Sequence, residues 1–379
     1  MVYHPAMSKV QAGSPKGRGW PTSITRIEQN RVEIVGRSIR ELVGKRSLPE
    51  TVHLLIKRTF PEAHRLSRFN AIAFEAAVRP PPSAFRIESE HVSKTVARHL
   101  LADREIAGYP ADGRDGEYRK TIFCTGRVAR YIASILGHAE ASADADPDEP
   151  FSHWLYRVFA GHDVVRTERA TMLEALVVAC MDHGFTPPST QACVLAASTR
   201  VPWELAVAMG VGVISDVHGG ASSRAAEFYA DFLHRATNRG KDRSDVLESL
   251  MRETLSRGQR IPGLGHRIHT ADPRCNALWS VAEETGVAAE CVQASRLASK
   301  VFARVRGTSL PINVDGVVGA IVADMGLPPI VGTLGFVLGR ISGLSAHYFE
   351  EVNTFPAMRW IDFSEARYLK EGTCLEDSA

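Results

Sequence analysis

Three polar residues stand out because each lies in an otherwise apolar, glycine-rich stretch. They are His218, which precedes Gly219 and Gly220, His266 in Gly-Leu-Gly-His-Arg, and Asp315 in Asn-Val-Asp-Gly. Two imidazoles and one carboxylate form a set that can transfer protons. The three residues are separated by 48 and 49 positions, too far to share one local element. The set can therefore act only if the fold brings the three segments together.

The composition is that of a globular protein with a large core. The chain has 379 residues, 44% of them hydrophobic and 23% charged, with a formal net charge of +2. This length favours more than one structural unit. The balanced charge argues against nucleic acid or a membrane as the main partner, and no segment reaches membrane-spanning length without charges. Residues 1–20 lack an apolar run, which indicates a loose arm rather than a signal peptide.

The cysteines give no sign of a disulfide framework. None of the six forms a Cys-x-x-Cys pair, and their spacing is irregular. This pattern argues against structural zinc as well, and it fits a reducing cytoplasm.

Helical patterns dominate the rest of the chain. Apolar residues at helical spacing predict helices over 171–181, 221–236, 245–257, 276–285 and 288–305. Residues 23–27 and 31–35 alternate around Gln29 and Asn30, which predicts one β-hairpin. Loops are predicted at 79–83 and 141–150. The fold class expected from these patterns is mainly α with a short N-terminal hairpin.

Taken in order, these segments resemble the citrate synthase family. The matching stretches are Thr22-Ser23-Ile24 with residues 35–42, the aromatic segment 151–160, Asp182-His183, His218-Gly219-Gly220-Ala221, Gly265-His266-Arg267 with Asp272-Pro273-Arg274, Asn313-Val314-Asp315, and Gly339-Arg340. The resemblance runs from about residue 23 to about residue 360, and residues 61–115 match poorly.

The resemblance implies a two-domain fold with the active site in the cleft between the domains. The expected parts are an N-terminal arm and hairpin (1–34), a large helical domain (35–218 and 326–379) and a smaller helical domain (219–325). It also implies a cytoplasmic homodimer or dimer-based oligomer. No cofactor would be bound permanently, because the coenzyme A thioester is itself a substrate.

The resemblance assigns a role to each candidate residue. Asp315 would be the general base, His218 would donate to the thioester oxygen, and His266 would donate to the keto oxygen of the acceptor. The groups expected to bind the carboxylates of a 2-oxo dicarboxylate are His183, Arg274, Arg340 and Arg359, the last contributed by the neighbouring subunit. The residues expected to approach coenzyme A are Gly263, Leu264, Gly265 and Asn313.

Several of these residues also have simpler interpretations. His183 could cap a helix C-terminus, and Asp315 could cap a helix N-terminus. Arg340 and Arg359 could be surface charges. His266 and His269 could suggest zinc, but they lack a cysteine or carboxylate set, so no metal is predicted.

The expected activity is condensation of acetyl-CoA, or another short acyl-CoA, with oxaloacetate or a related 2-oxo acid, as in the tricarboxylic acid cycle. Two stretches depart from typical synthases, at residues 180–189 and at 316–320. The second is similar to citryl-CoA lyases and to the citryl-cleaving module of ATP-citrate lyase. The alternatives are therefore a citryl-CoA lyase and a catalytically weak, acyl-CoA-binding paralogue.

Overall fold

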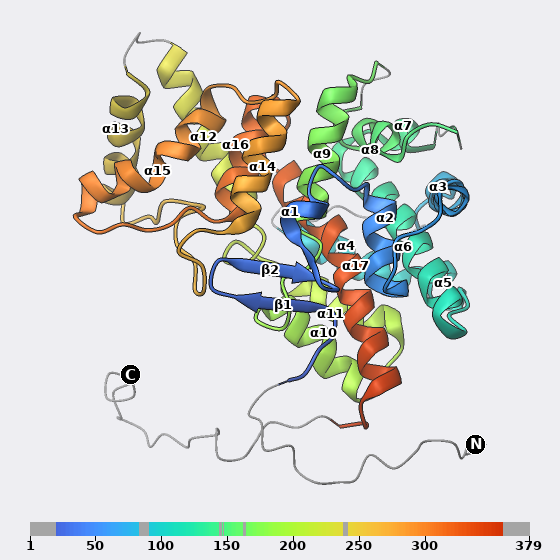
Figure 1. Ribbon diagram of the computed structural model, residues 1–379. Helices are drawn as coiled ribbons and strands as arrows, with labels where there is room; N and C mark the ends of the chain where they lie inside the picture. Colours follow the sequence, from blue (N-terminus) through green and yellow to red (C-terminus); the bar gives the residue numbers. More distant parts are fainter. Residues whose placement is uncertain are drawn as a thin grey trace, which may run out of the picture.

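The computed structural model describes residues 20–82, 91–143, 146, 148–161, 164–237 and 242–358. Within these ranges the chain forms seventeen helices and one three-stranded antiparallel sheet (Figure 1). The mainly α fold class with an N-terminal hairpin is therefore confirmed. The predicted arm up to residue 19 and the predicted site residue Arg359 lie outside the described residues. No helix in the described ranges is both long and apolar enough to cross a membrane.

The predicted hairpin is present and carries one more strand. Its strands are β1 (Thr25–Glu28), β2 (Arg31–Ile34) and β3 (Arg37–Ser38), with Thr25 opposite Ile34 and Glu28 opposite Arg31. Side chains alternate along β2, so that Val32 and Ile34 are buried. Before β1, the backbone N–H and hydroxyl of Ser23 donate to Glu350, at 2.8 and 2.5 Å. These bonds tie the base of the hairpin to the last helix.

Twelve helices form the larger group, on the right in Figure 1. They are α1 (Ile39–Leu42), α2 (Leu48–Lys57), α3 (Ala63–Val78), α4 (Val92–Ala102), α5 (Arg104–Gly108), α6 (Gly113–Leu136), α7 (Ala139–Ala143), α8 (Phe151–Ala160), α9 (Thr167–Ala179), α10 (Pro188–Ser198), α11 (Trp203–Gly212) and α17 (Val331–Thr354).

The other five helices pack mainly on one another, in yellow to orange in Figure 1. They are α12 (Ala221–Thr237), α13 (Arg243–Ser256), α14 (Pro273–Glu284), α15 (Glu290–Arg306) and α16 (Val314–Asp324). The most extensive contact among them is between α12 and α16.

Polar caps set where several helices begin. Ser47 and Glu50 form a reciprocal capping box at the start of α2. Asp242 accepts from the N–H of Ser244 at 2.7 Å at the start of α13, and Asp272 accepts from the N–H of Arg274 at 3.0 Å at the start of α14. All five helices predicted from apolar spacing are present, with ends moved by a few residues.

The prediction of a loop over residues 141–150 is partly wrong. Its first residues belong to α7, where Ser142 is fully buried. The carbonyl of Ser142 accepts from the indole N–H of Trp154 at 3.0 Å. A distant aromatic side chain therefore stabilises this short helix, and the local polar composition could not show it.

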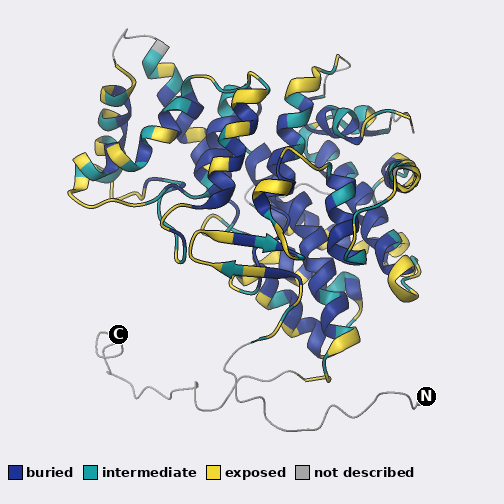
Figure 2. Ribbon diagram, in the orientation of Figure 1, coloured by how far each residue is buried: buried dark blue, intermediate teal, exposed yellow. Residues whose placement is uncertain are grey.

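The last helix, α17, runs through the larger group and is buried along most of its length (Figure 2). Two of its glycines allow another backbone to approach closely. A β-carbon at Gly339 would lie 2.4 Å from the carbonyl oxygen of Val177, and one at Gly343 would lie 2.2 Å from that of Met181. This approach places Arg340 of α17 beside the end of α9.

Candidate active site

His218 lies in the turn between α11 and α12 and contacts a serine of α10. Its Nε2 is 2.9 Å from the hydroxyl oxygen of Ser189, which also accepts from Nη1 of Arg340 at 3.0 Å. The Ser189 hydroxyl can donate its own proton to Nε2 of His218 while it accepts from Arg340, and in that arrangement the ring proton of His218 is on Nδ1. Burial, followed by the charge of Arg340, lowers the pKa of His218 to about 3. The ring is neutral at pH 7.

His266 lies in the loop before α14 and is held by its own backbone. Its Nδ1 accepts from the N–H groups of Ile268 and His269, at 3.0 and 2.9 Å. The proton of the neutral ring is therefore on Nε2, which lies 4.0 Å from a carboxylate oxygen of Asp272. Burial lowers the pKa of His266 to about 4. His266 thus presents a neutral N–H donor.

The loop that carries His266 rests directly on the start of α16. The carbonyl of Gly263 accepts from the N–H of Asn313 at 2.9 Å, and the carbonyl of Gly265 accepts from the side-chain amide of Asn313 at 2.8 Å. A β-carbon on Gly263, whose φ is +79°, would lie 2.2 Å from the α-carbon of Gly316. Leu264 forms a β-bridge with Ile312. The four residues predicted to approach coenzyme A thus join the His266 loop to α16.

Asp315 lies in the first turn of α16. The helix cap is Asn313, whose side-chain oxygen accepts from the N–H of Gly316 at 3.2 Å. The capping interpretation of Asp315 is therefore wrong. One oxygen of Asp315 accepts from the hydroxyl of Ser222 at 2.5 Å. Burial raises the pKa of Asp315, while the Ser222 hydrogen bond and the charges of Arg274 and Arg340 oppose that rise.

The two described arginines are almost fully buried, with 4% of Arg274 and 1% of Arg340 exposed. Arg274 donates from Nε and Nη2 to the two oxygens of Asp272, at 3.0 and 2.6 Å. Arg340 donates from Nε to the carbonyl of Cys180 at 3.2 Å and from Nη1 to Ser189. Among the described residues, Nη1 of Arg274 and Nη2 of Arg340 have no hydrogen-bond partner. The surface-charge interpretation of Arg340 is wrong.

His183 lies beyond α9, which ends at Ala179, so it does not cap that helix. Its ring centroid is 5.5 Å from that of His266 and 5.3 Å from that of His269. Its Nε2 lies 3.1 Å from Nε2 of His269. Burial, and next the charge of Arg274, lowers the pKa of His183. One ring nitrogen from each of the three histidines lies within 4.8 Å of the others.

The fold therefore brings most of the predicted residues to one place. The charge of Arg340 acts on His183, His218 and Asp315, and the charge of Arg274 acts on His183, His266 and Asp315. This arrangement combines one carboxylate base, two neutral N–H donors and two guanidinium groups. It can remove a proton from carbon and stabilise negative oxygen on a substrate that carries carboxylates.

Three contacting side chains were not predicted in these roles. Ser189 contacts His218 from 29 residues away, Ser222 contacts Asp315 from 93 residues away, and His269 contacts His183 from 86 residues away. No local pattern marks a serine for such a contact.

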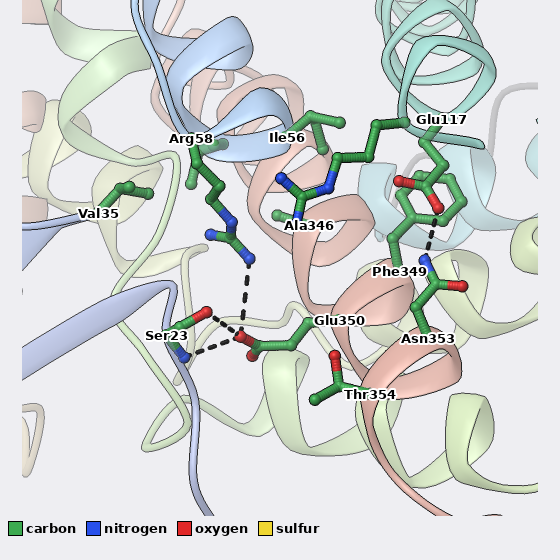
Figure 3. A pocket seen from close by; sticks show the side chains of 12 residues that line it. Ser23, Val35, Ile56, Arg58, Glu117, Ala346, Phe349, Glu350, Asn353 and Thr354 are labelled. Carbon is green, nitrogen blue, oxygen red and sulfur yellow. Dashed lines mark hydrogen bonds and ion pairs between the residues drawn. The ribbon is translucent and has the colours of Figure 1, made fainter. Parts of the chain in front are cut away.

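A separate cavity of about 330 Å³ lies between α2, α6 and α17 (Figure 3). Two polar contacts join the elements that line it. Arg58 lies 3.6 Å from Glu350, and the amide of Asn353 donates to Glu117 at 2.6 Å. None of the predicted site residues lines this cavity, so it is distinct from the candidate active site.

Comparison with known proteins points to one family. The family model described as "Citrate synthase, C-terminal domain" matches residues 19–360. A citrate synthase of Haloferax volcanii is 27% identical over 342 residues, covering 83% of this chain and 84% of that protein.

Two solved structures are similar to this fold. The citrate synthase of Thermoplasma acidophilum, solved with carboxymethyl coenzyme A and oxaloacetate, matches with a TM-score of 0.74 at 18% identity, covering 96% of this chain and 97% of that one. The citryl-CoA lyase of Hydrogenobacter thermophilus matches with a TM-score of 0.52 at 28% identity, covering 60% of this chain and 86% of that one.

Proposed function

The chain belongs to the citrate synthase family, and from that premise we propose that it condenses acetyl-CoA, or another short acyl-CoA, with oxaloacetate or a related 2-oxo acid and releases coenzyme A. The observation that carries this proposal is the grouping of Asp315 with two neutral histidines. In His266, the backbone donors to Nδ1 place the ring proton on Nε2. Such a set suits a reaction that forms and stabilises an enolate.

The first step is removal of a proton from the thioester methyl group by Asp315. Burial raises the pKa of this carboxyl, which makes it a stronger base than an exposed aspartate. As the enolate forms, His218 donates its Nδ1–H to the thioester oxygen. The neutral imidazole already carries this N–H group, so the hydrogen bond needs no prior change in the charge of the ring.

The second step is attack of the enolate carbon on the keto carbon of the acceptor. His266 donates its Nε2–H to the keto oxygen and protonates the alkoxide as the carbon–carbon bond forms. The product of this step is still a coenzyme A thioester, and water then hydrolyses it to a carboxylate and free coenzyme A. The unfilled nitrogens of Arg274 and Arg340, together with His183 and Arg359, bind the carboxylates, because a guanidinium group suits planar carboxylate recognition. Coenzyme A lies along the loop of Gly263, Leu264 and Gly265 and the adjoining Asn313. The cleft between the large domain (35–218 and 326–379) and the small domain (219–325) encloses the substrates.

A citryl-CoA lyase is the second candidate, because the solved lyase is 28% identical to this chain over the part that it matches, against 18% for the solved synthase. The lyase, however, matches a smaller share of the chain. The test measures free thiol released from several acyl-CoAs with several 2-oxo acids. In parallel, citryl-CoA is supplied to the protein and its products are identified. A synthase yields free thiol at a steady rate. If citryl-CoA instead yields oxaloacetate and acetyl-CoA with little citrate, the protein is a lyase with the same catalytic residues. Thermal stabilisation by coenzyme A without any turnover would indicate the acyl-CoA-binding paralogue.

A homodimer is the proposed assembly, in the cytoplasm. The five described cysteines are unpaired and buried, as a reducing compartment favours. If Arg359 serves the neighbouring subunit, a mixture of Arg359→Ala and Asp315→Asn proteins regains activity through heterodimers. Heterodimers without activity would contradict that sharing.

A further inference from the structure

The turn of the hairpin is hydrogen-bonded to the loop that carries His266 and His269. The backbone N–H of Asn30 donates to Nδ1 of His269 at 2.9 Å. The side-chain oxygen of Asn30 accepts from the N–H groups of Thr270 and Ala271 at 2.9 and 2.8 Å, and its amide nitrogen donates to the hydroxyl of Thr270 at 2.8 Å. Four hydrogen bonds from one residue therefore hold this loop.

This contact determines where the proton of His269 lies. Because Nδ1 of His269 accepts from Asn30, the neutral ring keeps its proton on Nε2. That nitrogen is 3.1 Å from Nε2 of His183, so His269 donates and His183 accepts. Burial lowers the pKa of both rings, which keeps them neutral. The remaining proton of His183 must then be on Nδ1.

The same hydrogen bonds argue against a metal ion among the three histidines, although their nitrogens are close enough to hold one. A metal ligand needs a free lone pair on a ring nitrogen. In His266 and His269, backbone N–H groups already occupy the lone pair of Nδ1, and Nε2 carries the proton. Neither ring offers a free lone pair, so the three histidines are linked by hydrogen bonds rather than arranged to hold a metal ion.

We propose that His269 is a positioning residue that keeps His183 in its Nδ1–H tautomer, and that Asn30 at the hairpin turn holds His269 in place for this purpose. His183 then presents an N–H donor, rather than a lone pair, to a carboxylate of the 2-oxo acid. This inference rests on the proposed function for the identity of that ligand. The order of the hydrogen bonds from Asn30 to His269 to His183 stands on the geometry alone.

Two substitutions at His269 separate its two hydrogen bonds. In His269→Gln, the side-chain amide nitrogen takes the place of Nε2 and can still donate to His183. In His269→Asn, the side-chain oxygen takes the place of Nδ1 and can still accept from Asn30, but no donor reaches His183. His269→Gln therefore keeps the hydrogen bond to His183, and His269→Asn keeps the hydrogen bond from Asn30.

The measurement is the KM for the 2-oxo acid beside the KM for the acyl-CoA. Loss of a hydrogen bond to a charged group corresponds to roughly tenfold or more in binding. We expect His269→Asn to raise the KM for the 2-oxo acid by about that factor and to leave the KM for the acyl-CoA unchanged. In His269→Gln, the KM for the 2-oxo acid should stay close to that of the parent protein. Equal effects of the two substitutions on both KM values would overturn the proposal.

The hairpin is tested at Asn30, whose φ is +60°. Asn30→Gly preserves this backbone conformation but removes the three side-chain hydrogen bonds to Thr270 and Ala271. It should raise the same KM as His269→Asn, by a smaller factor. Gln29→Ala is the matched control, because Gln29 is an exposed neighbour in the same turn. A change confined to the KM for the acyl-CoA would contradict the role of the hairpin.

A spectroscopic measurement tests the tautomer without any turnover. In protein labelled with ¹⁵N at histidine, the ring nitrogens of His183, assigned with a His183→Asn variant, report which nitrogen carries the proton. We expect Nδ1–H in the parent protein and a loss of this preference in His269→Asn. An Nε2–H tautomer or a doubly protonated ring in the parent protein overturns the proposal. If Nδ1–H is found but no acyl-CoA and 2-oxo acid react, the proposed function fails and the positioning role of His269 stands.

Discussion

Two clusters of buried charge can be compared within this molecule. The first joins Asp103, at the start of α5, to Arg127 of α6, and all three guanidinium nitrogens of Arg127 are used. Nε donates to Asp103 at 2.7 Å, while Nη1 and Nη2 donate to the carbonyls of Ala76, Arg79 and Pro80 at 2.8–3.2 Å. Asp103 also accepts from the hydroxyl of Tyr131. Its hydrogen bonds connect α3, α5 and α6.

The second cluster is the candidate active site. There Arg274 and Arg340 are equally buried, but each retains one terminal nitrogen without a partner among the described residues. One oxygen of Asp315 accepts from Ser222. Burying a charge is costly in both places. The difference is that the first cluster satisfies its own groups, whereas the second leaves donors for a ligand. Unfilled donors, more than burial, therefore distinguish a site from a structural ion pair.

The largest expected effect comes from Asp315→Asn. The amide keeps the shape of the side chain but cannot accept the methyl proton, so the turnover number should fall by roughly 10³. Affinity for coenzyme A should remain. The measurements are steady-state turnover and deuterium exchange into the methyl group of acetyl-CoA. A loss of at most about tenfold would remove Asp315 from the role of base.

The same substitution in the first cluster should act on stability instead. Asp103→Asn leaves the charge of Arg127 uncompensated in a buried setting and should lower the free energy of unfolding by about 3 kcal/mol. Turnover by the folded protein should stay close to that of the parent. Chemical denaturation measures the first quantity, and activity at low temperature measures the second. A catalytic defect without loss of stability would show that the two clusters do not differ as described.

Replacing either catalytic histidine with alanine should lower the turnover number by roughly 10², the usual effect of losing one oxyanion donor. His218→Ala should impair enolate formation, because His218 is assigned to the thioester oxygen. His266→Ala should instead impair binding of the acceptor and formation of the carbon–carbon bond. Methyl proton exchange, measured apart from overall turnover, distinguishes the two steps. Equal loss of exchange in both variants would contradict this division.

The smallest expected effect is a shift in pH dependence on Ser222→Ala. The hydroxyl of Ser222 stabilises the charged form of Asp315, so its removal raises the pKa of this carboxyl further. The base works only when deprotonated, and kcat/KM should therefore begin to fall at a higher pH as the solution is acidified. Ser223→Ala is the matched control, because Ser223 bonds to Thr333 instead. An unchanged acid limb in Ser222→Ala would show that the hydrogen bond does not affect the base.

Residues 61–115 form a part of the fold that could not be predicted from the sequence. They matched the family poorly, and no helix was predicted there. In the structure, α3 packs on α6 so closely that a β-carbon at Gly126 would lie 2.1 Å from the carbonyl oxygen of Ala73. The hydroxyl of Ser93, in α4, donates to the carbonyl of Ile214 at 2.6 Å, just before the turn that carries His218. Packing partners far along the chain determine the place of these helices, so local patterns could not predict it.

By itself, the sequence determined the residue types of the candidate site and the helical character of the chain. Both are local properties, since glycine-flanked motifs and apolar spacing are read within a few residues. Only the tertiary structure decided which nitrogens of His183 and His269 carry their protons. That choice depends on which donor meets the ring, and the donor to His269 is Asn30, 239 residues away. It likewise decided which arginine nitrogens are left for a ligand, because Cys180 and Ser189 reach Arg340 from distant parts of the chain.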